Sequence, residues 1–160
     1  MVQDAAVSAS TDRFEAAYRQ EGPRLWRALV VFTADRELAS DAPSEAFAQG
    51  LAGGDRVRDP VAWTWRAAFR IVAGALKERG AIDDLAVPDR SYDVPESLWD
   101  VFEALAKLSP NQRLAVVLHD YADRPTDEVA AILGASRATV HVHLSQGRRR
   151  LRRLLEVEDE

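Results

Sequence analysis

The residues of this chain that are best suited to chemistry are basic and lie near its C-terminus. His141 and His143 precede a run in which five arginines fall within six residues. The five are Arg148, Arg149, Arg150, Arg152 and Arg153. Guanidinium groups match the geometry of phosphate oxygens and stay charged, so such a run is typical of a surface that contacts the nucleic-acid backbone. The alternative is the solvated face of an ordinary helix.

The residue types of the chain give little indication of a metal site or a catalytic site. The chain has no cysteine, and its three histidines are His119, His141 and His143. The last two are spaced i, i+2, which points them to different sides of a helix and makes poor ligand spacing. No Ser-His-Asp arrangement or carboxylate pair stands out either. We therefore expect no metal, no cofactor, no small-molecule substrate and no enzymatic activity.

The spacing around residues 125–144 predicts a helix-turn-helix. Residues 126–133 form a two-turn amphipathic pattern, with Pro125 suited to its first turn. Gly134 suits a helix end that needs a positive φ, and Ser136 can cap the next helix. Val140 and Leu144 then continue the apolar stripe at i and i+4. A plain helical hairpin within a bundle is the alternative interpretation.

A helix-turn-helix places the start of its second helix in the major groove of DNA, beside the base edges. This placement identifies the candidate base-reading residues, and also the arginines that would lie near phosphates. They are Ser136, Arg137, Ala138, Thr139, His141, His143, Arg148 and Arg149.

The elements around this motif all have helical apolar spacing, and nothing alternates like a strand. We expect a helix over residues 14–32, bent or split at Gly22-Pro23. Asp35 is expected to cap a second helix through Phe47, and Pro60 to open a third that ends near Arg79. Further helices are expected over 98–108, from Ser109-Pro110, over 125–133 and over about 136–155. The prediction is an all-α fold.

Charge divides the chain, although its net charge is −5. Residues 13–80 form a first helical domain, and residues 98–155, with a net charge of +3, form the helix-turn-helix domain. Between them, residues 81–97 carry two prolines and a net charge of −4, which predicts an acidic linker. Residues 1–12 are expected to be a disordered leader, and 156–160 an acidic tail. No apolar run of about 18 residues occurs and no signal peptide is found, so we expect a cytoplasmic protein without a membrane span.

Aromatic and basic residues also gather in the first domain. Trp63 and Trp65 could stack on an unpaired base, as aromatic residues do in single-strand grooves. Core packing is the alternative, favoured for Trp65 because it shares the apolar stripe with Phe69. Arginines that could hold backbone phosphates flank this region. They are Arg56, Arg58, Arg66 and Arg70.

Three segments of the second domain carry a resemblance to known proteins. Residues 108–118, 127–140 and 147–152 resemble the sigma-factor domain that reads the promoter −35 element. They are also similar to the output domain of two-component-type regulators. In the first half, residues 14–25, 35–41 with Glu45-Ala-Phe47, and 59–63 with Arg66 resemble the extracytoplasmic-function (ECF) subfamily of bacterial sigma factors.

The resemblance implies a transcription initiation factor that binds core RNA polymerase and recognises promoter −10 and −35 elements. The first domain would bind polymerase through Asp41, Ser44, Glu45 and Phe47. It would capture the −10 strand through Arg56, Arg58, Trp63, Arg66 and Arg70. An anti-sigma protein is a further partner that the resemblance implies.

The chain also departs from the family pattern. Pro43 and Ser44 replace an aliphatic residue and Gln in the polymerase-binding helix, where Asp41 could instead cap a restarted helix. Gly74 replaces a common Asp, and His141 and His143 stand where Lys or Arg is usual. A stand-alone helix-turn-helix regulator and a degenerate sigma-like polymerase-binding module are therefore the alternatives.

Overall fold

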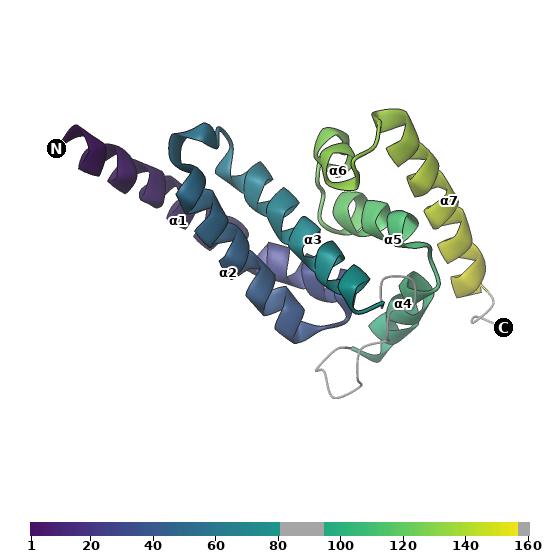
Figure 1. Cartoon of the computed structure of the whole chain (residues 1–160). Coiled ribbons are helices and arrows are strands. Elements are labelled where there is room, and N and C mark those ends of the chain that lie inside the picture. The colour runs from purple at the N-terminus through teal and green to yellow at the C-terminus, as the bar shows by residue number, and fades with distance from the viewer. Residues whose placement is uncertain (81–94, 157–160) are drawn as a thin grey trace.

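The computed structural model describes residues 1–80 and 95–156, and within these ranges it is helical with no strand. This confirms the predicted all-α class. The elements are α1 (Val2–Thr33), α2 (Arg36–Gly53), the short 3-10 turn η1 (Gly54–Arg56), α3 (Pro60–Glu78), α4 (Glu96–Ala106), α5 (Pro110–Val116), the π-helical turn η2 (Val117–Tyr121), α6 (Thr126–Leu133) and α7 (Arg137–Glu156). In Figure 1, α1 to α3 form one bundle, and α4 to α7 form a second bundle beside it.

Side-chain caps explain where several helices begin. Asp35 Oδ1 accepts hydrogen bonds from the first free backbone N–H groups of α2, at 3.0 and 3.1 Å. Asp59 Oδ1 accepts one from Ala62 at 3.1 Å at the start of α3. Ser109 and Gln112 form a reciprocal capping box at the start of α5. These caps confirm the predicted starts of the three helices.

Two prolines lie inside continuous helices. The break considered at Gly22-Pro23 is absent, because α1 continues through Pro23, which is exposed. The carbonyl left without its N–H partner can there bond to water. The α2 helix likewise continues through the buried Pro43, so no helix restarts at Asp41. It ends at Gly53 rather than at Phe47.

The leader predicted to be disordered is helical in the structure. The first helix begins at Val2, and residues 2–12 belong to it. Most of these residues are exposed, and the N-terminal end of α1 projects from the bundle (Figure 1). The segment contains no Gly or Pro and three alanines, so nothing in its composition interrupts a helix that is already nucleated by the packed residues that follow.

The first bundle packs around the side of α3 that carries Trp65, Phe69 and Val72, which are all fully buried. In the second bundle, α5, α6 and α7 pack around Val129 and Val140, which are also fully buried. The two bundles share one apolar cluster, whose members run from Leu25 of α1 to Leu144 of α7. The halves that were predicted as separate domains therefore lie in direct contact.

The predicted linker over residues 81–97 falls mostly outside the described residues. Glu96 and Ser97, which were assigned to it, form the first turn of α4. The predicted acidic tail begins at Glu156, the last residue of α7, and its other residues lie outside the described part. No helix within the described residues is long and apolar enough to span a membrane. None of the described residues form a cluster of three or more possible metal ligands.

Candidate nucleic-acid interface

Helices α6 and α7 form the predicted helix-turn-helix. Gly134 ends α6 in the left-handed region at φ 65°, where a side chain would be strained. Ser136 then caps α7, since its Oγ accepts a hydrogen bond from the Thr139 N–H at 3.1 Å. The buried Val129 and Val140 hold the two helices together. The turn and the cap confirm the motif that the sequence predicted.

The first turn of α7 exposes most of the candidate base-reading side chains. Arg137, Ala138, Thr139 and His141 are exposed. His143 differs from them because it is half-buried, and its Nδ1 atom is buried without a hydrogen-bond partner among the described residues. The face that is free to approach a base edge is therefore formed by residues 136–141 more than by His143.

Arg137 is paired across the turn. Its Nε lies 2.6 Å from Oδ1 of Asp127, at the start of α6. Both side chains are mostly exposed, at 68% and 72%. An ion pair exposed to this degree contributes little to stability, because water and salt screen it. Asp127 therefore neutralises Arg137 in the free protein without holding it strongly.

A shallow basic groove of about 400 Å³ continues along α7. It is lined by His141, Ser145, Arg148, Arg149 and Arg152. Arg148 is engaged there, since its Nε donates a hydrogen bond to Asp120 Oδ2 of η2 at 2.8 Å. Arg149 and Arg152 are exposed and are the residues of this groove most available to phosphates.

The interaction between Arg148 and Asp120 shifts the pKa of both side chains. The hydrogen bond from Arg148 holds the pKa of Asp120 below its ordinary value, against the opposing effect of partial burial. The same bond raises the pKa of Arg148. His119 Nδ1 also lies 3.0 Å from Asp120 Oδ1. Asp120 thus orients a basic side chain of α7 from a neighbouring element.

A second basic site lies at the N-terminal end of α3, in a cleft of about 340 Å³. Four of the five residues assigned to −10 recognition line it. They are Arg56, Arg58, Trp63 and Arg66. Asp127 and Glu128 of α6 line the same cleft from the other half of the molecule. The fold thus assembles the arginines and the tryptophan, and it also places three carboxylates in the same lining, because Asp59 joins Asp127 and Glu128 there.

Buried packing positions this cleft. Arg13 Nη2 donates hydrogen bonds to the carbonyls of Val57 and Arg58 at 3.0 and 2.9 Å, which fixes the loop before α3 to α1. Trp63 stands edge-on to Phe14, with ring centroids 6.0 Å apart and planes at 88°. Gly50 makes room for both rings, because a Cβ there would overlap Phe14 and lie 2.9 Å from Trp63.

Arg70 and Trp65 lie outside the cleft. Arg70 donates to the Ala131 carbonyl of α6 at 3.1 Å, so it joins the two halves in this arrangement. Trp65 is fully buried and stacks on Phe69 with the ring planes at 6°. This confirms the interpretation of Trp65 as a core residue, while Trp63 is half-buried at the cleft.

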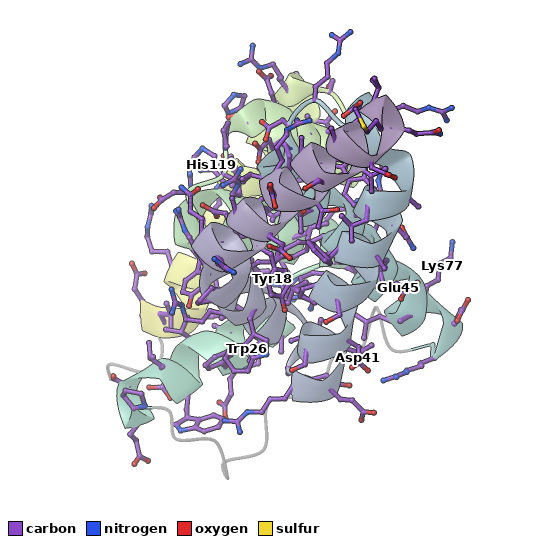
Figure 2. The ribbon with its side chains drawn as sticks, turned by 90° about the vertical axis from the view of Figure 1, so that its left-hand side faces the viewer. Tyr18, Trp26, Asp41, Glu45, Lys77 and His119 are labelled. Atoms are coloured by element: carbon purple, nitrogen blue, oxygen red, sulfur yellow. The ribbon has the colours of Figure 1, made fainter. Side chains whose placement is uncertain are left out.

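The residues assigned to polymerase binding all lie on α2. Asp41, Ser44 and Glu45 are exposed, and Phe47 is half-buried, with its ring centroid 5.6 Å from that of Tyr18. Figure 2 shows Asp41 and Glu45 on α2, with Tyr18 on the adjacent α1. The helix combines acidic and aromatic groups.

Sequence reasoning missed the residues that act on the site from other elements. Asp120 holds Arg148, Asp127 pairs with Arg137, and Arg124 packs its guanidinium 4.8 Å from the Trp65 ring centroid. The only sequence feature that pointed to such pairing was the first turn of α6, whose two acidic residues precede a basic helix. Long-range pairing of this kind has no periodic signature.

Comparison with known protein families finds a match that includes the helix-turn-helix of α6 and α7. The sigma-70 region 4 family matches residues 98–151. This part of the chain is therefore similar to sigma-70 region 4. The matched range covers α5, η2, α6 and most of α4 and α7, so it contains the whole helix-turn-helix described above.

The resemblance extends beyond region 4. The ECF RNA polymerase sigma factor SigE of Mycolicibacterium smegmatis is 26% identical over 160 residues, which covers 90% of this chain. The match spans only 62% of SigE, so this chain corresponds to less than two thirds of that relative. Sigma factors are transcription factors rather than enzymes.

Two solved structures share the fold. The sigma factor RpoE of Bartonella quintana, in complex with the anti-sigma factor NepR, superposes with a TM-score of 0.74 at 23% identity and covers 90% of this chain and 97% of that chain. CnrH, in complex with the cytosolic domain of CnrY, also superposes with a TM-score of 0.74. The two sequences are 22% identical, and the match covers 96% of this chain and 94% of that chain. The fold of this chain is thereby shared with both structures over at least 90% of its length.

Proposed function

We propose that this chain is a transcription initiation factor that binds core RNA polymerase and directs it to promoters by recognising −10 and −35 elements. The observation that carries the proposal is the exposed first turn of α7 within the segment that matches sigma-70 region 4. Arg137, Thr139 and His141 are presented there on a helix of the kind that enters the major groove. In this proposal Ser136, Ala138 and His143 flank that contact, and Arg148 and Arg149 hold the adjacent phosphates.

The cleft at the start of α3 is the proposed −10 site. Arg56, Arg58 and Arg66 surround Trp63, which combines cationic groups for backbone phosphates with an aromatic face for an unstacked base. Trp63 is held edge-on to Phe14, so its ring is fixed before any base arrives. Such preorganisation lowers the entropic cost of capturing a single strand.

Polymerase binding is assigned to the exposed side of α2. Asp41, Ser44 and Glu45 are exposed there and belong to neither proposed DNA site, so they are free to contact a partner, and Phe47 is half-buried on the same helix. The net charge of −5 supports this division of roles. An acidic protein is repelled by DNA phosphates, so the polymerase must supply much of the affinity and the factor the sequence preference.

An anti-sigma protein is the third proposed partner. The RpoE and CnrH structures are complexes with NepR and CnrY respectively. In this chain an apolar groove of about 280 Å³ is lined by α1, α4, α5, η2 and α7, and the exposed Leu98 and Tyr121 belong to its lining. An exposed apolar surface of this kind is suited to a protein partner.

The test is reconstitution with core polymerase. The purified chain should co-elute with core enzyme and give discrete transcripts from genomic fragments on which core alone gives none. The double variant Asp41→Lys, Glu45→Lys should lose co-elution, and the matched variant Asp12→Lys, Glu15→Lys, on the exposed side of α1, should keep it. A chain that binds DNA sequence-specifically without polymerase, and never co-elutes with it, would be a stand-alone regulator instead.

A further inference from the structure

We propose that Asp127 of α6 is a specificity-determining residue of the helix-turn-helix, because it positions the Arg137 guanidinium for a two-point contact with a guanine of the −35 element. This inference rests on the function proposed above and adds a residue to which that function gives no role. Asp127 lies in the first turn of α6, and Arg137 is the first residue of α7. Asp127 is a positioning residue here, since it acts on the base through Arg137.

The first turn of α7 offers one strong reader of a base edge. Arg137 is the only charged side chain among residues 137–140. Ala138 presents only a methyl group, and the Thr139 hydroxyl lies 2.9 Å from Ser136 Oγ, so it belongs to the helix cap. A guanidinium group carries two parallel N–H donors that match the O6 and N7 acceptors of guanine in the major groove.

The carboxylate meets the guanidinium on its inner edge. Nε of Arg137 lies 2.6 Å from Oδ1 of Asp127. Within the described residues Arg137 has no other ion pair or hydrogen bond, so its two terminal nitrogens stay available. These terminal nitrogens are a pair of donors of the kind that reads guanine. Asp127 thus restrains the side chain without using the atoms that would contact the base.

The carboxylate stands on a rigid support. Val129 of α6 and Val140 of α7 are fully buried between the two helices. The turn at Gly134 is closed by the Ala135 N–H, which donates to the Ala130 carbonyl at 3.0 Å. The starts of α6 and α7 therefore keep a fixed relation to each other. Contacts supported by packed helices in this way hold a side chain more accurately than contacts from a loop.

The neighbouring acidic residue has a different partner. Glu128 Oε2 lies 2.6 Å from Arg124 Nη2, and the Glu128 side chain is only 21% exposed. Of the two carboxylates in this turn, Asp127 is the one that faces the second helix of the motif. A carboxylate beside a DNA-binding helix repels phosphates and lowers affinity for every sequence. Its position is therefore suited to selectivity and not to affinity.

DNA binding should strengthen the pair. In the free chain both side chains are mostly exposed, so water and salt screen their attraction. A base pair docked against Arg137 displaces that water, and the attraction rises as screening falls. Arg137 held in this way cannot turn toward a phosphate when another base replaces the guanine. The mismatch then stays uncompensated, which widens the difference in affinity between matched and mismatched DNA.

Base preference of the full chain in complex with core polymerase tests the proposal. Competition among promoter fragments, each with one −35 base pair replaced, locates the guanine as the position where Arg137→Ala lowers the preference. Asp127→Asn should lower the preference for guanine at that same position by about threefold or more. Its affinity for random DNA should stay equal or rise, because one negative charge near the phosphates is removed.

Two further variants distinguish positioning from a general effect of charge or folding. Asp123→Asn removes a carboxylate that pairs with Arg24 and not with Arg137, and asparagine tolerates the φ of 54° at this residue. It should leave the base preference unchanged. In the Arg137→Ala background, Asp127→Asn should cause no further loss of preference, because the side chain that it positions is gone.

The outcomes separate the two proposals. The positioning role is overturned if Asp127→Asn weakens binding to all sequences alike, or if it lowers the preference equally with and without Arg137. It is also overturned if Arg137→Ala changes the preference at no position. In these three cases the initiation function stands. If the unmodified chain gives core polymerase no sequence preference at all, the initiation function itself fails.

Discussion

Arg148 and Asp120 join α7, the second helix of the helix-turn-helix, to η2. The Arg148 Nε donates to Asp120 Oδ2 at 2.8 Å, and the two residues are 28 positions apart in the chain. The bond spans from η2 to α7 and keeps the guanidinium at the edge of the basic groove. One arginine of the C-terminal run is therefore positioned by a carboxylate, while its neighbour Arg149 is exposed.

This pair predicts a pH-dependent stability. The pKa of Asp120 is lowered in the folded chain, chiefly by the hydrogen bond from Arg148. Its contribution is therefore present above the unfolded-state pKa, about 3.9, and is lost as pH falls through the folded-state value. Asp120→Asn should reduce the free energy of unfolding by about 0.5–1 kcal/mol at neutral pH, since both side chains are partly exposed and screened.

Urea unfolding at pH 7 and at about pH 3 checks the prediction. The unmodified chain and Asp120→Asn should differ less in free energy of unfolding at the lower pH than at pH 7. The control Asp41→Asn, exposed on α2, should have nearly the same free energy of unfolding as the unmodified chain at both pH values. An equal loss at both pH values would mean that the asparagine acts through packing and not through lost charge.

Two glycines predict opposite effects of the same substitution. A Cβ on Gly50 would overlap the Phe14 ring and crowd Trp63, so Gly50→Ala should destabilise the chain by about 1–3 kcal/mol. Gly74 lies exposed in α3 with nothing within 4 Å of an added Cβ. Gly74→Ala should therefore stabilise by up to about 1 kcal/mol through helix propensity. Thermal unfolding of the two variants would refute this account if both shift the midpoint the same way.

Pro43 predicts a stabilising replacement. It lies buried within the continuous α2 and provides no N–H for the carbonyl of Ala39. Alanine should gain about 3 kcal/mol in helix propensity and lose about 1.6 kcal/mol from two buried methylene groups, for a net gain of about 1 kcal/mol. Denaturant unfolding measures this directly. A less stable Pro43→Ala variant would show that the ring fills a space which alanine leaves empty.

Local signals predicted much of this fold. Asp35, Asp59 and Ser109 begin helices because a side-chain oxygen reaches an N–H two or three residues away, and Gly134 ends one because of its own φ. These causes lie within a few residues of sequence. The end of α2 was missed because Gly50 is held in the helix by its packing against Phe14 and Trp63, which lie far away in the chain.

The residues of the candidate site could be predicted from the sequence, but the side chains that pair with them could not. Amphipathic spacing placed Arg137 and His141 on one exposed turn, as the structure has them. The same spacing says nothing of Asp127 beside Arg137, or of Arg124 over Trp65. These contacts arise where two bundles meet, and their partners are set by the relative placement of helices distant in sequence.

Substitutions in α7 should separate base reading from phosphate binding. In the complex with core polymerase, Arg137→Ala and His141→Ala should each reduce preference for the base they read by about 1–3 kcal/mol. Arg149→Ala should weaken binding to all sequences alike and lower the slope of log affinity against log salt by about one. Competition between promoter and random DNA over a salt series measures both. Uniform losses from all three variants would mean that the helix contacts only the backbone.

The central claim is that one chain contacts two promoter elements. Photo-crosslinking amino acids at positions 63 and 141 test it most directly, in complexes of the full chain with core polymerase and a fragment selected by its transcript. The account predicts crosslinks from position 141 to duplex near −35 and from position 63 to the strand near −10, at two separate places on the fragment. Crosslinks from both positions to the same few base pairs, or from position 141 alone with no polymerase required, would contradict it.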